Sequence, residues 1–414
     1  MTRGTDPAAT ISILRSVLVG LPLALPSLSF PGVINQFTPT QTDMKTMVVP
    51  RGTWTVTGTI AVPSGCTLIV EAGAVLRFQS GKGLTVSGSS GALPGAFFQA
   101  IGQDGTENGL AVFTSDSDSK GPGQWSRFLF GEGSRVMMQY CRVECGGQGF
   151  GEMINVDNGA TVTIYDSEVR HASQIGLNVR GNDLAKTTCV DVERTTFSYL
   201  QTGPSSSGPA ILVGGASPVR FTLRDSFILN TGPTAASRCV GLKISGTQDP
   251  ALVVVDGNTF GNNSTGILFD TSTSEAAATV GRNTFLAHSR DAIRGSWKSI
   301  ARSVFGVPAA DVFSVTTTGY AGIVVDGGTS PPTTDSTLEK DGSARYLIPD
   351  NSLHAIPLVG SGRTLTIAEG VRLEISPGVW LGVSGRLDVQ GKSGAEVTFT
   401  RTLVLGGWIA TGGC

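Results

Sequence analysis

The residues best suited to chemistry in this 414-residue chain are acidic and basic side chains in its second half. Calcium requires several oxygen ligands that converge from neighbouring segments, and an arginine beside such a site could serve as a base. The possible calcium ligands are Asp225, Asp256, Asp270 and Asp291, and the possible bases are Arg224, Arg282 and Arg294. These residues do not share one register of the repeat described below, and the repeat position of Asp256 carries mixed residue types that are typical of a solvated face.

Two glutamates and two histidines are weaker candidates. Paired carboxylates for glycoside hydrolysis lie about 5 to 10 Å apart, a distance that neighbouring strands about 4.8 Å apart could provide. Glu168 and Glu193 fall in adjacent repeats but at different repeat positions, which argues against a designed pair. His171 and His288 fall in turns, where a lone histidine is more often solvated or bonded to backbone than a base. The sequence therefore assigns no catalytic, cofactor or metal residue.

Glycine and cysteine patterns give no further site. The glycines at 146, 147, 149 and 151 neither follow a dinucleotide-type strand nor open a helix, so a tight turn is expected there rather than a phosphate loop. Cys141 and Cys145 have no second close cysteine pair, and the chain has three histidines, which argues against structural zinc. A disulfide between these two cysteines stays open as an alternative in an oxidising compartment.

The five tryptophans could stack on sugar rings. Trp125 and Trp408 occupy equivalent places in two copies of a longer repeat, so we expect them to pack inside the protein. Trp297 has no such counterpart and is the more open candidate. Trp54 and Trp380 complete the set.

An eight-residue pattern that recurs six times must position all of these residues. It reads apolar, any, apolar, any, any, small or amide, any, apolar, and it occupies residues 136–143, 162–169, 190–197, 221–228, 253–260 and 278–285. A fixed period of 25 to 32 residues indicates a solenoid, in which each unit stacks on its neighbours. The sixth position suits a bend, since its side chains can bond backbone groups left unpaired at a corner: Cys141, Ser167, Thr195, Ser226, Asn258 and Asn283.

A second short strand follows each octad as two apolar residues spaced by two, beginning with Ile154 and Val156 and fading at Ile293 and Gly295. Two or three short strands per coil predict an all-β parallel β-helix, with a β-sandwich of regularly spaced strands as the alternative. The eighth octad positions are expected to stack in one core column: Val143, Val169, Phe197, Ile228, Phe260 and Phe285.

Composition agrees with a long solenoid and excludes other classes. Only 15% of residues are charged, 56 are glycine, and the net charge of −2 gives no footprint for nucleic acid. No uninterrupted apolar run reaches the roughly 18 to 20 residues of a membrane helix. Residues 1–36 are expected to be either a secretory signal peptide or an N-terminal cap on the first coil.

A longer repeat divides the chain. Residues 66–88 align without a gap on residues 363–385, with nine of 23 positions identical, and the match resumes at a Phe-Thr element and a Gly-x-Trp. We therefore expect a β-helix module at 37–328, a linker at 329–341 and the start of a second, incomplete module at 342–414. A coil cut there would expose strand edges, which suggests a fragment or a segment completed elsewhere in the molecule.

These features resemble bacterial secreted or cell-surface right-handed parallel β-helix repeat proteins, over roughly residues 45–300 and 336–408. The resemblance rests on the entry segment around Leu365, Gly370 and Leu373, its earlier twin, the Gly-x-Trp, and the Asn-Thr-Phe triplets at 258–260 and 283–285. It implies a single-stranded right-handed solenoid, export, and association with the cell envelope. The family's pectin-hydrolase signatures (paired aspartates, Gly-His-Gly, Arg-x-Lys) and the Asp-Pro-His run of alginate epimerases are absent.

The functional hypothesis is an exported structural or adhesive protein without catalysis. Its outer faces and long turns, at 201–209, 231–238 and 245–250, would meet polysaccharide or cell-surface protein partners. The alternative is a polysaccharide lyase or glycoside hydrolase acting in a groove along one face, and calcium is expected only under that alternative. The oligomeric state and the ligand are left open by the sequence.

Overall fold

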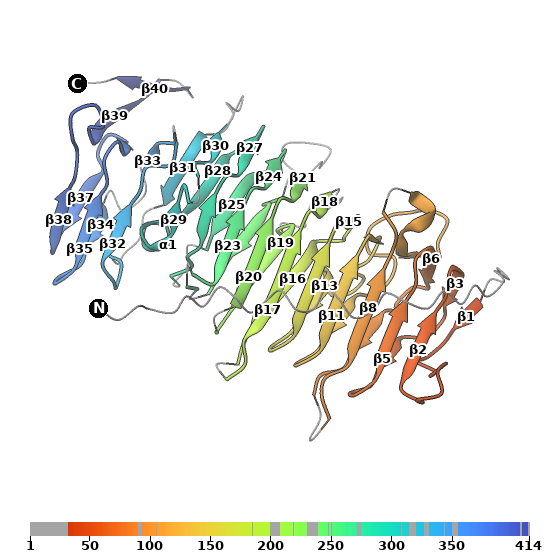
Figure 1. Ribbon diagram of the computed structural model, residues 1–414. Helices are drawn as coiled ribbons and strands as arrows, with labels where there is room; N and C mark the ends of the chain where they lie inside the picture. Colours follow the sequence, from red (N-terminus) through yellow and green to blue (C-terminus); the bar gives the residue numbers. More distant parts are fainter. Residues whose placement is uncertain are drawn as a thin grey trace.

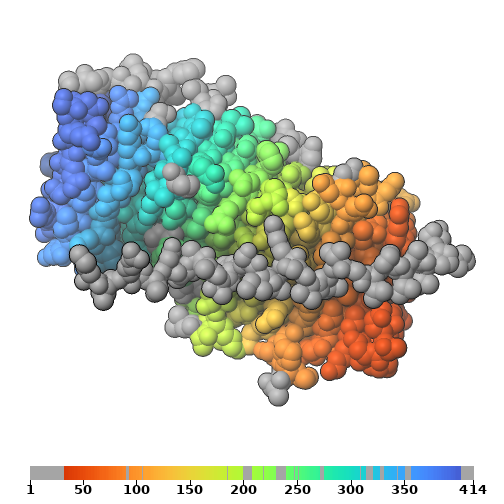
Figure 2. All heavy atoms as spheres, viewed as in Figure 1, coloured from red at the N-terminus to blue at the C-terminus, as the bar shows by residue number. Residues whose placement is uncertain are grey.

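Short strands stack along one axis into an elongated body in the computed structural model (Figures 1 and 2). The structure describes residues 32–89, 93–104, 106–183, 185–198, 208–217, 219–229, 239–246, 248–249, 251–270, 275–307, 309–313, 320–326, 331–342, 344–349, 355–405 and 408–412. Of the expected signal or cap at 1–36, residues 1–31 lie outside these ranges, as do most of the long turn at 201–209 and all of the turn at 231–238.

Three long sheets, named A, B and C, run side by side along most of the stack. The strands of sheet A are β1 (Gly32–Ile34), β3 (Gly52–Val56), β6 (Ala74–Phe78), β9 (Ala111–Ser115), β12 (Cys141–Glu144), β15 (Glu168–Arg170), β18 (Thr196–Ser198), β21 (Phe227–Leu229), β24 (Thr259–Gly261), β27 (Thr284–Leu286) and β30 (Val312–Phe313). The strands of sheet B are β2 (Thr46–Val49), β5 (Thr67–Val70), β8 (Phe97–Ile101), β11 (Arg135–Gln139), β14 (Thr161–Tyr165), β17 (Thr188–Glu193), β20 (Val219–Arg224), β23 (Val253–Asp256), β26 (Thr279–Gly281) and β29 (Val304–Phe305).

Sheet C continues beyond the other two. Its strands are β4 (Ile60–Val62), β7 (Leu84–Val86), β10 (Phe128–Phe130), β13 (Glu152–Val156), β16 (Ile175–Gly181), β19 (Ile211–Gly215), β22 (Leu242–Ile244), β25 (Thr265–Phe269), β28 (Asp291–Ser296), β31 (Tyr320–Asp326), β33 (Tyr346–Ile348), β36 (Arg372–Ile375), β39 (Thr398–Leu405) and β40 (Trp408–Gly412). A three-stranded sheet holds β32 (Ser336–Leu338), β35 (Thr364–Ile367) and β38 (Arg386–Val389), and a two-stranded sheet holds β34 (Ala355–Val359) and β37 (Trp380–Val383). Helices are short: a 3-10 turn at Glu107–Gly109 and α1 (Trp297–Arg302).

The strand register confirms the parallel β-helix. Each octad contributes a strand to sheet B and a strand to sheet A, and the following apolar doublet forms the strand in sheet C. The expected core column pairs residue by residue through parallel strands: Val143, Val169, Phe197, Ile228, Phe260 and Phe285. The doublets align in the same way, from Ile154 through Leu177, Ile211, Leu242 and Ile267 to Ile293. A β-sandwich is thereby excluded, since its neighbouring strands would be mainly antiparallel.

The octad-bearing coils turn at left-handed corners, of which the first is described in all six coils and the second in four. Position 5 of the octad has positive φ throughout, at Tyr140, Asp166, Arg194, Asp225, Gly257 and Arg282. The second corner, two residues beyond the octad, has positive φ at Cys145, His171, Asn262 and Ala287. Because a Cβ makes this conformation unfavourable, the stacked coils must hold these residues in place.

Position 6 carries a polar ladder inside the first corner, as its residue types predicted. The hydroxyl of Ser226 accepts from the Thr195 amide at 3.0 Å, and Asn258 Oδ1 accepts from the Ser226 amide at 3.0 Å. Asn283 Oδ1 accepts in turn from the Asn258 amide at 3.0 Å. Each side chain thus satisfies a backbone donor of the preceding coil that the corner removes from the sheets.

Replacing Ala287 by glycine is expected to stabilise the protein. Ala287 is exposed and has a φ of 52°. A Cβ in the left-handed region costs about 1–2 kcal/mol, and glycine's greater loss of chain entropy returns roughly half of that gain. We expect a net gain of about 0.5–1 kcal/mol in urea unfolding. Ala61→Gly, at an exposed position in the extended strand β4, is the matched control and should lose roughly 0.5–1 kcal/mol. Equal signs for the two variants would refute the strain at this corner.

The stack changes geometry near residue 300. Sheets A and B end at β30 and β29, α1 follows β28, and sheet C alone continues into β33 and β36. The sequence alignment pairs β36 of the second copy with β6 of the first. β6 belongs to sheet A, but β36 continues sheet C, so the second copy is rotated relative to the first. We call the region from α1 to β33 the joint. β32 lies within the range expected to be linker, and the module boundaries stay a prediction.

Candidate functional site

Charged side chains on the outer faces pair with one another between coils. Arg194 binds Asp166 through two nitrogens at 2.6 and 3.0 Å, and Arg170 contacts Glu144 at 2.7 Å. Arg142 reaches both Glu107 and Glu168, and further cross-coil pairs join Arg127 to Glu152, Arg302 to Glu275 and Arg345 to Glu374. The partners in these bridges lie 25 to 35 residues apart in the sequence. The ion pairs therefore link successive coils, and the carboxylates in them are already bound to arginines of the same chain.

The expected calcium ligands are not brought together as one set, although the Asp225 amide donates to the Asp256 carbonyl at 3.1 Å. Asp225 lies at a corner after β20, Asp256 in sheet B, Asp270 just after β25, and Asp291 in sheet C. Asp256 is only 7% exposed and is bound by Arg282, whereas Arg224 in the same column is exposed, as the sequence suggested for that face. Asp270 contacts Lys243 at 3.3 Å, and Asp291 contacts Arg294 at 2.8 Å. Within the described ranges no group of three or more Asp, Glu, His or Cys side chains could hold a metal ion.

Two of the arginines proposed as bases, Arg224 and Arg282, lie in the coils on either side of Asp256, and the third lies in another sheet. Arg294 lies in sheet C and also binds Asp326 at 2.8 Å, and Arg282 binds Asp256. Arg224 ends β20 in sheet B. The hydrogen bonds that Arg282 donates to Asp256 raise its pKa. Burial lowers the pKa of Arg294, but the hydrogen bonds that it donates to Asp326 and Asp291 leave it raised overall. An arginine held this way is a poorer proton acceptor, so neither residue has the environment of a base.

The glutamate pair and the histidines have structural surroundings. Glu168 belongs to sheet A and Glu193 to sheet B, so they do not face one another as a catalytic pair would. His171 lies at the left-handed second corner, and burial lowers its pKa. His288 is not a solvated turn residue, because it is 2% exposed and packs against the Phe285 ring. Burial of a ring beside apolar neighbours explains the difference from the sequence expectation.

Backbone geometry tests the turn expected at the clustered glycines, and burial describes the state of Cys141 and Cys145. Gly147, Gly149 and Gly151 have φ values of 100°, 78° and 86°, which confirms a tight turn. Cys141 and Cys145 are both buried free thiols, so the disulfide alternative is not what the structure contains. Burial raises the pKa of Cys141 to about 12 and that of Cys145 to about 11, which makes both thiols unreactive at neutral pH.

The tryptophans include one correction. Trp125 is fully buried, stacks on Phe78 at 4.8 Å and donates to the Glu144 carbonyl, as its repeat position predicted. Trp297 is also fully buried and donates to the Leu358 carbonyl, so the expectation of an open ring there is wrong. It opens α1 at the joint, where it anchors the second copy. Trp380 in β37 is the open ring, with 76% of its surface exposed.

One cluster resembles an acid–base set in composition. Tyr320 donates to Glu374 at 3.3 Å, and Arg345 binds the other oxygen of the same carboxylate at 2.5 Å. Burial, followed by the charge of Glu374, raises the pKa of Tyr320 above its usual range. A tyrosine base for lyase chemistry would need the opposite shift. The cluster is therefore better suited to joining the coils of sheet C than to proton abstraction.

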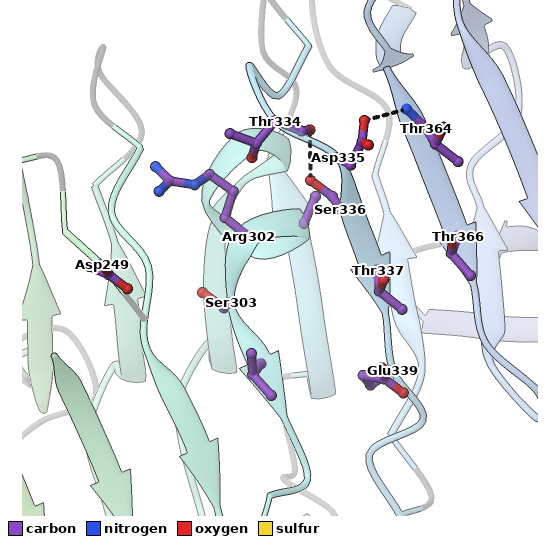
Figure 3. A pocket seen from close by; sticks show the side chains of 12 residues that line it. Asp249, Arg302, Ser303, Thr334, Asp335, Ser336, Thr337, Glu339, Thr364 and Thr366 are labelled. Atoms are coloured by element: carbon purple, nitrogen blue, oxygen red, sulfur yellow. Dashed lines mark hydrogen bonds between the residues drawn. The ribbon is translucent and has the colours of Figure 1, made fainter. Parts of the chain in front are cut away.

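A polar groove with a volume of about 730 Å³ lies at the joint (Figure 3). We call it the joint groove. It is walled on one side by the end of α1 and the start of β29, and on the other by β32 and β35. Its lining is Asp249, Ala301, Arg302, Ser303, Val304, Thr334, Asp335, Ser336, Thr337, Glu339, Thr364 and Thr366.

The joint groove presents hydroxyl and carboxylate groups. Thr337 and Thr366 are directly paired in register on the outward face of the three-stranded sheet, and Asp388 of β38 continues their row. Asp335 accepts from the Thr364 amide at 2.8 Å, which fixes one rim (Figure 3). Arg302, the cation in the lining, is bound to Glu275 at 2.9 Å. The groove is thus acidic and rich in hydroxyls, with no aromatic platform among its lining residues.

A second hollow lies near the N-terminal end. It has a volume of about 680 Å³ and is lined by Gln79, Ser80, Ser115, Asp116, Ser117, Gly123, Gln124 and Gln148. Gln148 closes one side through bonds to Ser80 and to the Gly81 amide. Sequence reasoning did not find either hollow. The Pro-Pro-Thr-Thr stretch at 331–334 marked the place of the joint groove, but the residues facing it depend on how the second copy is rotated.

No helix among the described residues is long and apolar enough to cross a membrane. No family profile matches the sequence, and none of the curated proteins does. Among solved structures, the chain is similar to the Streptococcus pneumoniae surface protein and adhesin PfbA, at 11% identity over 86% of this chain and 91% of that chain, with a TM-score of 0.24. A similarity at that level carries no information on function, and the fold stands on the strand register above.

Proposed function

We propose that this protein is an exported, non-catalytic binding scaffold that presents the joint groove and its outer faces to polysaccharide or cell-surface protein partners. The observation that supports it is the use of the outer-face arginines and carboxylates. In the described coils they pair across neighbouring strands, and no acid, base and metal-binding set converges. A rigid rod with neutralised faces is suited to display and poorly suited to turnover.

Polysaccharide is the ligand class that the joint groove fits best. Sugars offer many hydroxyl groups that donate and accept hydrogen bonds, and the threonine hydroxyls and carboxylates of the groove can answer both roles. Asp249, Asp335 and Glu339 make the lining acidic, while its arginine is already paired with Glu275. An anionic polymer would meet repulsion there, so neutral glycans are the better fit.

The test is binding measured together with turnover. The purified chain would be applied to a panel of neutral and acidic polysaccharides, with retention on immobilised polymer and release of short products measured on the same samples. We expect retention without products. Release of reducing or unsaturated ends from any polymer would refute the binding-scaffold proposal and favour the lyase or hydrolase alternative.

A groove variant locates the binding. Thr337→Arg combined with Thr366→Arg places two long side chains across the joint groove, and we expect it to weaken neutral-glycan binding at least about tenfold, or about 1.4 kcal/mol. Thr161→Arg, at an exposed threonine of sheet B, is the matched control and should bind as the parent does. Equal binding by all three proteins would move the site away from the groove.

A further inference from the structure

The polar ladder of the first corner ends in two aspartates that cross the joint. Asp311 lies between β29 and β30, and Asp341 lies between β32 and β33. Asp311 Oδ1 accepts from the Asn283 amide at 2.6 Å, and Asp341 Oδ1 accepts from the Asp311 amide at 2.8 Å. Each aspartate therefore accepts a hydrogen bond from the backbone amide of the preceding ladder residue, as the asparagines of the two earlier coils do, but it carries a carboxyl group instead of an amide.

The two carboxyls are buried, and neither forms a salt bridge with a cation in the described part of the chain. Asp311 is 4% exposed and Asp341 is fully buried, and the second oxygen of each, Oδ2, accepts no hydrogen bond from any described donor. The outer-face carboxylates described above contact arginines instead. Burial, and then the charge of Asp341, raises the pKa of Asp311 to about 8, and burial raises that of Asp341.

We propose that Asp311 and Asp341 share one proton and that this proton makes the pair a pH-sensitive clamp on the joint. Two carboxylates side by side in a dry interior repel each other, and a proton between them removes one charge and supplies the missing donor. Because sheets A and B end here, the Asp311–Asp341 bond is one of the links from the first copy to the second. The clamp does not depend on the proposed binding function.

The groups that face the pair are few. Asn283 comes from the preceding coil and donates its side-chain amide to Asp311 Oδ1 at 3.0 Å. Tyr346 in β33 is fully buried, and its pKa is raised by burial and then by Asp341 and Glu339. Its hydroxyl donates to the Glu339 carbonyl at 2.8 Å. Glu339 and Lys340 precede Asp341 in the chain. The main influences on Asp311 are burial and Asp341, so the proton replaces a counter-ion.

The sign of the pH effect follows from the raised pKa of Asp311. When the joint opens to water, the pKa of each carboxyl returns to about 4, so opening releases the shared proton. Between about pH 4 and pH 8 the closed joint binds one more proton than the open one, and rising pH therefore favours opening. The effect levels off above about pH 8, where the closed pair has also lost its proton. The clamp holds in acid and loosens toward alkaline pH.

The test compares the full chain with Asp311→Asn from pH 4.5 to pH 9. Asparagine keeps the acceptor for the Asn283 amide, and its own amide can donate to Asp341, as Asn258 and Asn283 do in their coils. The readouts are the urea midpoint and hydrogen exchange of β29, β30 and β33, corrected for intrinsic exchange. We expect the opening constant of the parent joint to rise by up to about tenfold per pH unit up to about pH 8, and that of the variant to stay nearly constant.

Two further variants keep the outcome decisive. Asp341→Asn is expected to flatten the pH dependence in the same way. Asp256→Asn removes a carboxylate that is bound by Arg282, so it should lose stability by an amount that does not grow between pH 6 and pH 8. The proposal is overturned if Asp311→Asn follows the parent's pH dependence, or if it is less stable than the parent at pH 8.

Discussion

Replacing Phe260 by aspartate is expected to unfold the coils around it. The Phe260 ring is fully buried and stacks on Phe285 at 5.2 Å with an interplanar angle of 9°. Losing a buried phenylalanine costs about 3–5 kcal/mol, and burying an unpaired carboxylate adds several more. The sum, at least about 5 kcal/mol, equals the whole stability of many domains. Because each coil contacts only its neighbours, we expect loss of order to spread through adjacent coils rather than along the entire rod.

Limited proteolysis and urea unfolding would measure this loss. Phe227→Asp is the matched control, because Phe227 belongs to the neighbouring strand β21 of sheet A but is 48% exposed on its outer side. We expect that control to stay within about 1 kcal/mol of the parent. If Phe260→Asp were as resistant to protease as the parent, the stacked column would not carry the stability assigned to it.

The repeat in the sequence was sufficient to predict the column that this variant tests. Positions 1, 3 and 8 of the octad face one interior, and the order of pairing follows directly from the order of the repeats, so Phe260 could be placed over Phe285 from spacing alone. The corner ladder was also predictable, because a buried hydroxyl or amide at position 6 is stable only if it forms hydrogen bonds with the backbone groups of the corner. Its continuation through Asp311 and Asp341 was missed, because neither aspartate lies in a recognisable octad.

The candidate site was much less predictable, for a physical reason. Which outward side chains meet depends on the stagger and rotation between coils, and the octad does not specify these quantities. Asp256 and Arg282 lie at positions 4 and 5 of adjacent octads, and pairing across this offset buries Asp256 although its column also holds exposed residues. Trp297 shows the same limit: its ring is buried because the second copy packs against α1, a contact between segments 61 residues apart.

Replacing Asn283 by leucine is the second change expected to have a large effect. Asn283 is fully buried at position 6, where its Oδ1 accepts from both the amide and the side chain of Asn258 at 3.0 Å. Its Nδ2 donates to the carbonyls of Val255 and Gly281 at 3.0 Å each. Leucine has a similar volume but leaves these backbone groups without partners. Each unsatisfied buried group costs about 1–3 kcal/mol, so we expect a loss of about 3–5 kcal/mol.

The matched variants separate the hydrogen bonds from the change in shape. Asn283→Ser should retain part of the stability, because Ser226 performs the same task two coils earlier by accepting from the Thr195 amide. Asn182→Leu, at an exposed asparagine after β16, should change the free energy of unfolding by less than about 0.5 kcal/mol. Urea unfolding of the three proteins gives the order. A serine variant no more stable than the leucine variant would mean that residue 283 acts through packing, and the ladder would then lose its role in holding the corner.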